Sequence, residues 1–276
     1  MEFVETPCDI CGSAEHSVLF IKEGFVHVRC GSCGLVYVNP RLADHLDGQI
    51  CAGTAEMGDE SLSPSQINRL LTEIKRLEKF RSSNQILEIG PGKGWFLEQA
   101  IKRGWEAWAV EVNIKALSRL RKMGIQHILS ESAESFKVPD RHFDVIRMWD
   151  VIEHLPSPMS ALRLSQRALR NGGMIRLSTT NFASLSRMVN GPEWVYLNGA
   201  DHITLFEPET IFSALKQAGF SQIKIRTRSF NLRKKLYHPE KEFNNPSVIL
   251  RPFRKLIDET IRLTKFGHQM IVEAKK

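Results

Sequence analysis

The sequence predicts an α/β fold: a doubly wound, mostly parallel seven-stranded sheet with a small zinc ribbon at its N-terminus. From residue 85 onward, short apolar segments alternate with helical patterns, which is typical of a parallel sheet with crossover helices. A glycine-rich turn follows the first of these segments, and four of the five cysteines form two closely spaced pairs. Hydrophobic residues make up 42% of the 276 residues and charged residues 25%, which is typical of a globular protein and excludes a disordered or coiled-coil chain.

The N-terminal residues lack the basic flank and apolar core of a secretory signal, and the sequence has no uninterrupted apolar run long enough to span a membrane. We therefore expect a cytoplasmic protein. A reducing cytosol keeps thiols available for metal binding.

The cysteines predict a structural Zn²⁺ site in residues 1–41. They occur as Cys8-x2-Cys11 and Cys30-x2-Cys33, a spacing typical of two zinc knuckles. Short β-branched and aromatic segments between and after the knuckles predict the strands of a ribbon. Two disulfides are the alternative, and the missing export signal favours zinc. Four thiolates leave no open position for water, so we assign the ion a role in folding and docking.

Residues 42–62 are mixed in composition and predict a linker or flap before a domain over 63–276. Ser63, Pro64 and Gln66 then match a helix start with a capping box. Apolar residues recur at helical spacing up to Phe80, so this helix should pack one face on the following domain.

A strand over residues 85–89 leads into the glycine turn, which carries Glu88, Gly90, Gly92 and Gly94. A phosphate-binding P-loop needs Ser or Thr after its lysine, and a dinucleotide fingerprint needs glycine where Trp95 stands. Both alternatives fit poorly. The pattern Glu-x-Gly-x-Gly-x-Gly resembles that of class I S-adenosylmethionine (SAM) methyltransferases, which implies that these four residues contact SAM.

The next strand, residues 106–111, ends in Glu111, about twenty residues past the first glycine, where an acid can accept hydrogen bonds from both hydroxyls of a ribose. Further strands are predicted at 125–129 and 143–148. In the family that the glycine turn resembles, the loop after the third strand carries an Asp that binds adenine. Here Ser132 and Ala133 occupy that loop, so the resemblance implies adenine contacts for them, although they could equally be ordinary loop residues.

Residues 143–158 resemble the segment of ubiquinone-biosynthesis-like O-methyltransferases that passes beneath the SAM methyl group. The resemblance implies that Trp149 packs on the cofactor. It also implies that Asp150, Glu153 and His154 face the acceptor or hold a divalent cation. The alternative is that Glu153 and His154 begin a helix and fix its loop.

A fifth strand is predicted at 174–179, and the stretch 200–208 resembles the acceptor-covering segment of the same relatives. His202 in this stretch is the candidate base, because a histidine near neutral pH can take a proton from an attacking hydroxyl. The alternative is that His202 caps the helix that starts at Pro208.

The last two strands are predicted at 221–229 and 269–274, the final one antiparallel, with an insertion at about 230–268 between them. Residues 224–276 hold fourteen Lys and Arg against five Asp and Glu, whereas the whole chain has a net charge of +7. The insertion therefore predicts a basic amphipathic helix. Such a helix could contact a membrane surface, cover a substrate cleft or pack on its own domain.

The leading hypothesis is a SAM-dependent transfer of a methyl group to a hydroxyl, or to carbon, of a small metabolite, sugar or glycan precursor. One alternative is a ribosomal RNA methyltransferase, and another is a binding module that has lost catalysis. Because the C-terminal fifth carries all of the excess positive charge, we expect no stable nucleic-acid partner. The sequence does not determine the oligomeric state.

Overall fold

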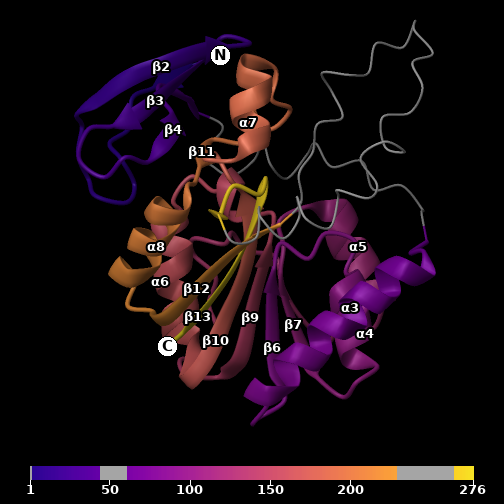
Figure 1. The fold of residues 1–276 in the computed structure, drawn as a ribbon. Coiled ribbons are helices and arrows are strands. Elements are labelled where there is room, and N and C mark those ends of the chain that lie inside the picture. The colour runs from indigo at the N-terminus through magenta and orange to yellow at the C-terminus, as the bar shows by residue number, and fades with distance from the viewer. Residues whose placement is uncertain (1, 44–60, 229–263) are drawn as a thin grey trace, which may run out of the picture.

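The computed structural model describes residues 2–43, 61–228 and 264–276 (Figure 1). Its main sheet has seven strands in the order β12-β13-β10-β9-β6-β7-β8. Their bounds are Gln85–Ile89 (β6), Glu106–Val110 (β7), His127–Leu129 (β8), Phe143–Trp149 (β9), Leu169–Thr180 (β10), Ser221–Arg228 (β12) and Gln269–Lys275 (β13). Only β13 runs antiparallel to its neighbours, β10 and β12. The predicted fold class is therefore confirmed.

Helices cover both faces of this sheet (Figure 1). On one face lie α3 (Pro64–Leu77), α4 (Trp95–Ile101) and α5 (Ile114–Lys122), and on the other lie α6 (Pro158–Ala168) and α8 (Pro208–Gln217). Successive residues of a strand point to opposite faces. Ile86 therefore packs in the apolar cluster of α3 and α4, while Leu87 packs in the cluster of α6 and α8.

The capping box predicted at the start of α3 is confirmed. The Ser63 hydroxyl accepts a hydrogen bond from the Gln66 amide at 3.3 Å, and the Gln66 side chain accepts one from the Ser63 amide at 2.8 Å. The helix buries Ile74 and Leu77 against the sheet and also buries the carboxylate of Glu73. These contacts hold α3 on the sheet, where it borders the same cavity as the glycine turn.

The N-terminal residues form a second, four-stranded sheet in the order β11-β4-β3-β2. Three strands come from the N-terminus: His16–Lys22 (β2), Phe25–Cys30 (β3) and Val36–Val38 (β4). The fourth, Thr204–Leu205 (β11), comes from the stretch that carries His202. A two-stranded pair, Phe3–Val4 (β1) with Arg41–Leu42 (β5), completes this part of the chain.

Several polar contacts between described residues fasten the N-terminal part to the main domain. Arg29 forms an ion pair with Glu207 at 2.8 Å. The Asp9 carboxylate accepts a hydrogen bond from the Met159 amide at 2.7 Å, at the start of α6. Arg41, almost fully buried, donates to the Pro156 carbonyl at 2.7 Å.

Most of the predicted linker and of the basic insertion lies outside the described residues. Within the described part, no helix is both long enough and apolar enough to cross a membrane.

Candidate active site

The glycine turn connects β6 to α4 at the carboxyl edge of the sheet. Gly90, Gly92 and Gly94 all have positive φ, at +66°, +53° and +72°. A Cβ on Gly90 would lie 2.6 Å from Val151, and one on Gly94 would lie 2.6 Å from Leu120, so these two glycines allow close packing. A Cβ on Gly92 would meet no atom within 4 Å. The middle of the turn therefore borders open space in which a ligand can approach the backbone.

Glu111 lies directly beside this turn. Its carboxylate accepts hydrogen bonds from the Gly92 amide at 3.1 Å and from the Val112 and Asn113 amides at 2.9 Å each. These three donors hold the acid in one orientation at the carboxyl end of β7. The structure thus brings together the turn and the acid that the sequence singled out twenty residues apart.

Ser132 and Ala133 follow β8, the strand next to β7. The Glu111 amide donates to the Leu129 carbonyl at 3.0 Å, so this loop begins beside the acid. The Ser132 hydroxyl accepts a hydrogen bond from the Glu134 amide at 3.3 Å and bonds the Ser135 hydroxyl at 3.0 Å. Ala133 is mostly buried.

Glu88 faces the α3 side of the sheet and is 2% exposed. It forms an ion pair with Arg147 of β9. Burial raises the pKa of Glu88 to about 7, and the Arg147 charge opposes that rise. Its carboxylate is therefore engaged by the protein itself, an arrangement that the sequence did not suggest.

The Glu88 pair belongs to a buried network of charges. Arg147 and Arg176 each donate to the Glu73 carboxylate at 3.0 Å, and Arg176 also pairs with Glu273. The network links α3 to β6, β9, β10 and β13. The signal that could have revealed it was an arginine between apolar neighbours in each of two strands, Arg147 in β9 and Arg176 in β10.

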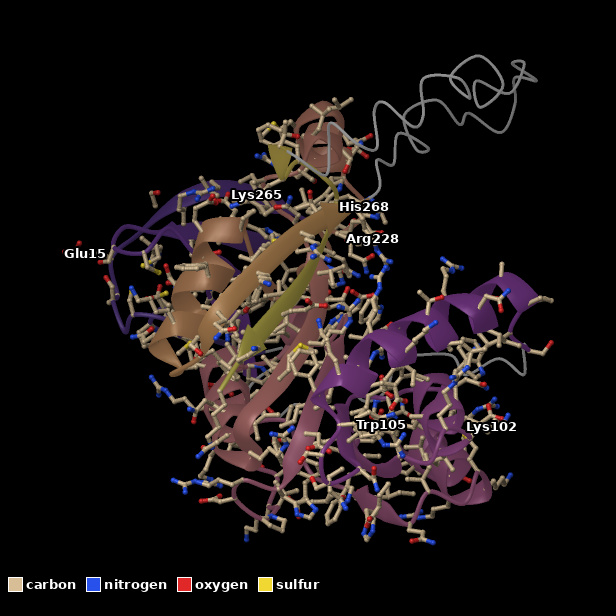
Figure 2. The ribbon with its side chains drawn as sticks, turned by 60° about the horizontal axis from the view of Figure 1, so that its bottom comes forward. Glu15, Lys102, Trp105, Arg228, Lys265 and His268 are labelled. Carbon is tan, nitrogen blue, oxygen red and sulfur yellow. The ribbon has the colours of Figure 1, made fainter. Side chains whose placement is uncertain are left out.

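A cavity of 640 Å³ opens between α3 and the carboxyl edge of the sheet. The residues that line it come from α3, β6, the glycine turn, α4 and β9, among other elements; they include Glu73, Glu88, Gly90, Phe96, Arg147 and Trp149. The Trp149 ring is partly buried, and the guanidinium groups of Arg147 and Arg228 lie 4.3 and 5.4 Å from its centroid. Figure 2 shows Arg228 at the end of β12, on the side of the sheet where α3 lies.

Asp150, His154 and His202, the three residues predicted to act on the acceptor, lie outside the lining of this cavity. The Nδ1 of His154 lies 2.9 Å from a carboxylate oxygen of Asp201, and the His154 and His202 rings are 4.7 Å apart. Asp150 accepts hydrogen bonds from Ser178 at 2.6 Å and Gln269 at 3.0 Å.

His202 does not cap the helix that follows it. At the start of α8 the Glu207 amide donates to the Thr210 hydroxyl at 2.9 Å, and the His202 side chain takes no part. Burial lowers the pKa of His202 to about 4, so this ring is neutral at pH 7. Burial raises the pKa of Glu153, which is 1% exposed, to about 7.

The structure brings together two residues of the predicted divalent-cation set, Glu153 and His154, with His202 as their neighbour in place of Asp150. Donor atoms of Glu153, His154 and His202 lie within 4.8 Å of one another, whereas the Asp150 carboxylate is bonded to Ser178 and Gln269. One carboxylate and two imidazoles are a poor match for Mg²⁺, which prefers oxygen ligands, but a common ligand set for Zn²⁺ or Fe²⁺. The divalent cation stays a prediction, and we derive no step through it.

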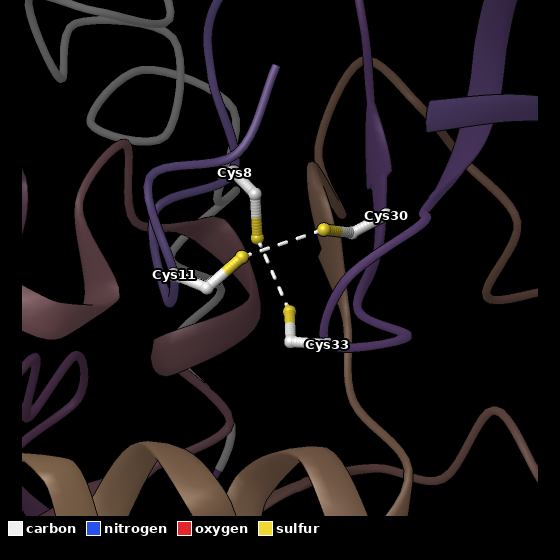
Figure 3. A group of neighbouring side chains, drawn as sticks. All are labelled: Cys8, Cys11, Cys30 and Cys33. Atoms are coloured by element: carbon white, nitrogen blue, oxygen red, sulfur yellow. Dashed lines mark hydrogen bonds between the residues drawn. The ribbon is translucent and has the colours of Figure 1, made fainter. Parts of the chain in front are cut away.

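The four N-terminal cysteines form a compact group (Figure 3). Sγ atoms of Cys8 and Cys33 are 3.4 Å apart, those of Cys11 and Cys30 are 3.5 Å apart, and all four lie within 4.8 Å of one another. All four are free thiols in the structure, which does not support the disulfide alternative. Tetrahedral zinc with Zn–S bonds of about 2.3 Å places its sulfurs somewhat under 4 Å apart, so this group fits a structural Zn²⁺.

The sequence and the fold were compared with known proteins. Residues 64–225 match the family described as a methyltransferase domain. A ubiquinone biosynthesis O-methyltransferase of Ruegeria sp. (strain TM1040) is 28% identical over 158 residues, which span 53% of this chain and 64% of that protein. The enzyme of the same name from Azoarcus sp. (strain BH72) is 25% identical over 170 residues, spanning 56% and 72% of the two chains.

The crystal structure of a SAM dependent methyltransferase from Archaeoglobus fulgidus has a TM-score of 0.53 and 23% identity, and the match covers 75% of this chain and 94% of that one. This likeness shows the fold alone. The family match covers more than half of the sequence. The chain therefore belongs to the methyltransferase domain family of class I SAM-dependent enzymes.

Proposed function

We propose that the protein transfers the methyl group of SAM to a hydroxyl of a small molecule. The observation that carries the cofactor assignment is the contact of 3.1 Å between the Glu111 carboxylate and the Gly92 amide. It puts a fixed hydrogen-bond acceptor beside an open stretch of backbone, which suits a ribose next to a phosphate-free ligand chain. The names of the two relatives support oxygen as the methylated atom.

Glu111 would accept hydrogen bonds from the ribose hydroxyls, and Ser132 and Ala133 would border the adenine. Gly90 and Gly92 would lie along the middle of the cofactor. Glu88, paired with Arg147, would shape the wall at the amino-acid end without contacting it as a free carboxylate. Bound SAM supplies an activated methyl on a cationic sulfonium.

The protein then has to orient the acceptor and remove one proton. In-line placement of the acceptor oxygen against the methyl is the main source of rate. The carboxylate and the backbone carbonyl of Asp201 both lie 2.9 Å from His154 Nδ1 and orient that ring, as a carboxylate orients the imidazole of a general base. His202 has too low a pKa to be an efficient base at pH 7, so we assign proton removal to His154.

Glu111→Ala tests the cofactor site. The change removes the ribose acceptor and leaves the Gly92 amide without its partner, so affinity for S-adenosylhomocysteine is expected to fall about ten- to a hundredfold. Isothermal titration calorimetry on the full chain measures it. Glu106→Ala, at the opposite end of the same strand, is the matched control and should bind like wild type. Equal affinity of Glu111→Ala and wild type would remove the proposed site.

Two histidine variants test the base. His154→Gln is expected to lower methyl transfer about a hundredfold or more while leaving S-adenosylhomocysteine affinity within about twofold. His202→Gln should cost no more than about tenfold, because its ring is a weak base. The measurement is transfer from methyl-labelled SAM to the accepting cell fraction. A larger loss in His202→Gln than in His154→Gln would reverse the assignment.

A further inference from the structure

We propose that the cavity beside Trp149 binds an oxyanion of the acceptor, a carboxylate or a phosphate ester, through Arg228. This inference rests on the proposed methyltransferase function and adds the chemical class of the acceptor to it. Gln269 accepts a hydrogen bond from Arg228 and donates one to Asp150, so an acceptor whose oxyanion is held by Arg228 at the cavity would extend past Asp150 to place its hydroxyl near His154.

The lining of the cavity is strongly cationic. Six of the side chains that border it are basic and two are acidic; the basic ones are Arg69, Arg76, Lys93, Arg147, Arg176 and Arg228. A cationic lining is unfavourable for a sulfonium cofactor alone. An anionic acceptor that enters with the cofactor offsets this repulsion.

The inner arginines are already satisfied. Arg147 is paired with Glu73 and Glu88, and Arg176 with Glu73 and Glu273. These buried pairs balance their own charge and make a rigid wall. The other arginines of the lining, Arg69, Arg76 and Arg228, form no ion pair with a described residue and can therefore interact with an incoming ligand.

Arg228 differs from that inner pair because its partner is neutral. Its Nε donates to the amide oxygen of Gln269 at 2.7 Å, and among the described residues it has no ion pair. Its guanidinium lies over the Trp149 ring at 5.4 Å, and the residue as a whole is exposed. Partial burial lowers the pKa of Arg228, and the charges of Asp150 and Glu73 oppose that shift. Stacking and one fixed hydrogen bond orient the planar group, while its terminal nitrogens keep the fork geometry that matches an oxyanion.

Helix α3 adds two more cations on the opposite wall. Arg69 and Arg76 are seven residues apart, so they lie on the same side of the helix as Glu73, and all three border the cavity. Neither arginine has an ion pair within the described part of the chain. An anion held by Arg228 would thus sit in a field that is positive from both walls.

The test uses phenyl phosphate as the probe and benzyl alcohol as its neutral counterpart. Each is titrated by calorimetry into the full chain saturated with S-adenosylhomocysteine. We expect phenyl phosphate to bind at about millimolar affinity, which is usual for a fragment of this size, and benzyl alcohol to bind at least about tenfold more weakly. Benzoate in place of phenyl phosphate distinguishes a carboxylate preference from a phosphate preference.

Arg228→Gln should weaken phenyl phosphate binding about ten- to a hundredfold and leave S-adenosylhomocysteine affinity within about twofold. Lys102→Gln, which removes a surface cation outside the cavity, is the control and should change neither. The proposal fails if phenyl phosphate and benzoate do not bind, or if binding survives in Arg228→Gln. It also fails if Arg228→Gln weakens S-adenosylhomocysteine instead, since the arginine would then hold the cofactor's own carboxylate. Absence of S-adenosylhomocysteine binding in wild type would instead refute the proposed function.

Discussion

Arg147→Met is expected to destabilise the protein by about 3–5 kcal/mol, because it leaves Glu88 with no ion-pair partner and removes one of the two cations beside Glu73. Both carboxylates are buried, and an uncompensated buried charge is costly. Equilibrium denaturation with urea measures the free energy of unfolding. Arg121→Met, on the exposed side of α5, removes the same charge without a buried partner and should change stability by less than about 0.5 kcal/mol.

The effect of Arg147→Met should grow with pH. The folded pKa of Glu88 is already raised from 4.5 to about 7, so the folded state holds this proton more tightly than the unfolded state. A carboxyl group whose pKa is higher in the folded than in the unfolded state lowers the free energy of unfolding as pH rises from about 4.5 to the folded pKa. Removing the Arg147 charge raises that pKa further and extends the loss above pH 7. The stability of Arg147→Met should therefore differ less from that of wild type at pH 5 than at pH 8. A larger difference at pH 5 would contradict the pairing of a buried, charged Glu88 with Arg147.

Cys30→Ser is expected to abolish stoichiometric zinc and to unfold the N-terminal sheet locally. Elemental analysis of the wild type should give one zinc per chain. Zinc binding contributes on the order of 10 kcal/mol to folding in small zinc domains, far more than the short strands here can replace. Cys51→Ser makes the same chemical change at a cysteine outside both pairs and should retain the metal.

Loss of zinc should also destabilise β11, the strand that follows His202. Val36 and Tyr37 of β4 pair with Leu205 and Thr204 of β11, and His202 lies two residues before that strand. Hydrogen exchange at β11 is therefore expected to accelerate in Cys30→Ser. Full zinc content in that variant, or unchanged protection of β11, would contradict this coupling.

Local patterns predicted much of the fold. All seven strands of the main sheet were expected from apolar segments bounded by turn residues, and the start of α3 from Ser63 and Gln66. The one large difference in bounds is β10, which begins at Leu169 rather than at 174. It includes the Asn171-Gly172-Gly173 turn sequence, and its register against β9 shifts between Leu169 and Met174. Glycine weakens the interior of a strand and often marks a bulge, and here Gly172 and Gly173 lie within the segment where the register shifts.

The missed features depend on contacts between distant segments. The pairing of β4 with β11 joins residues more than 160 positions apart, and no local pattern encodes it. The same holds for Glu73 with Arg147 and Arg176, whose meeting depends on the register of β9 against β10 and on the position of α3. For the candidate site, the turn and Glu111 could be predicted because motif spacing fixes them. The partners of Glu88 and Asp150 could not.

Transfer of label from methyl-labelled SAM is the measurement that tests the central claim most directly. The full chain is incubated with separated nucleic acid, lipid, glycan and small-metabolite fractions, with Glu111→Ala as the matched control. We predict label in an acid- or phosphate-bearing small molecule or glycan precursor, as an ether-linked methyl, and a large loss of labelling in Glu111→Ala at subsaturating SAM. Label confined to ribosomal RNA, or no label in any fraction despite S-adenosylhomocysteine binding, would contradict the account.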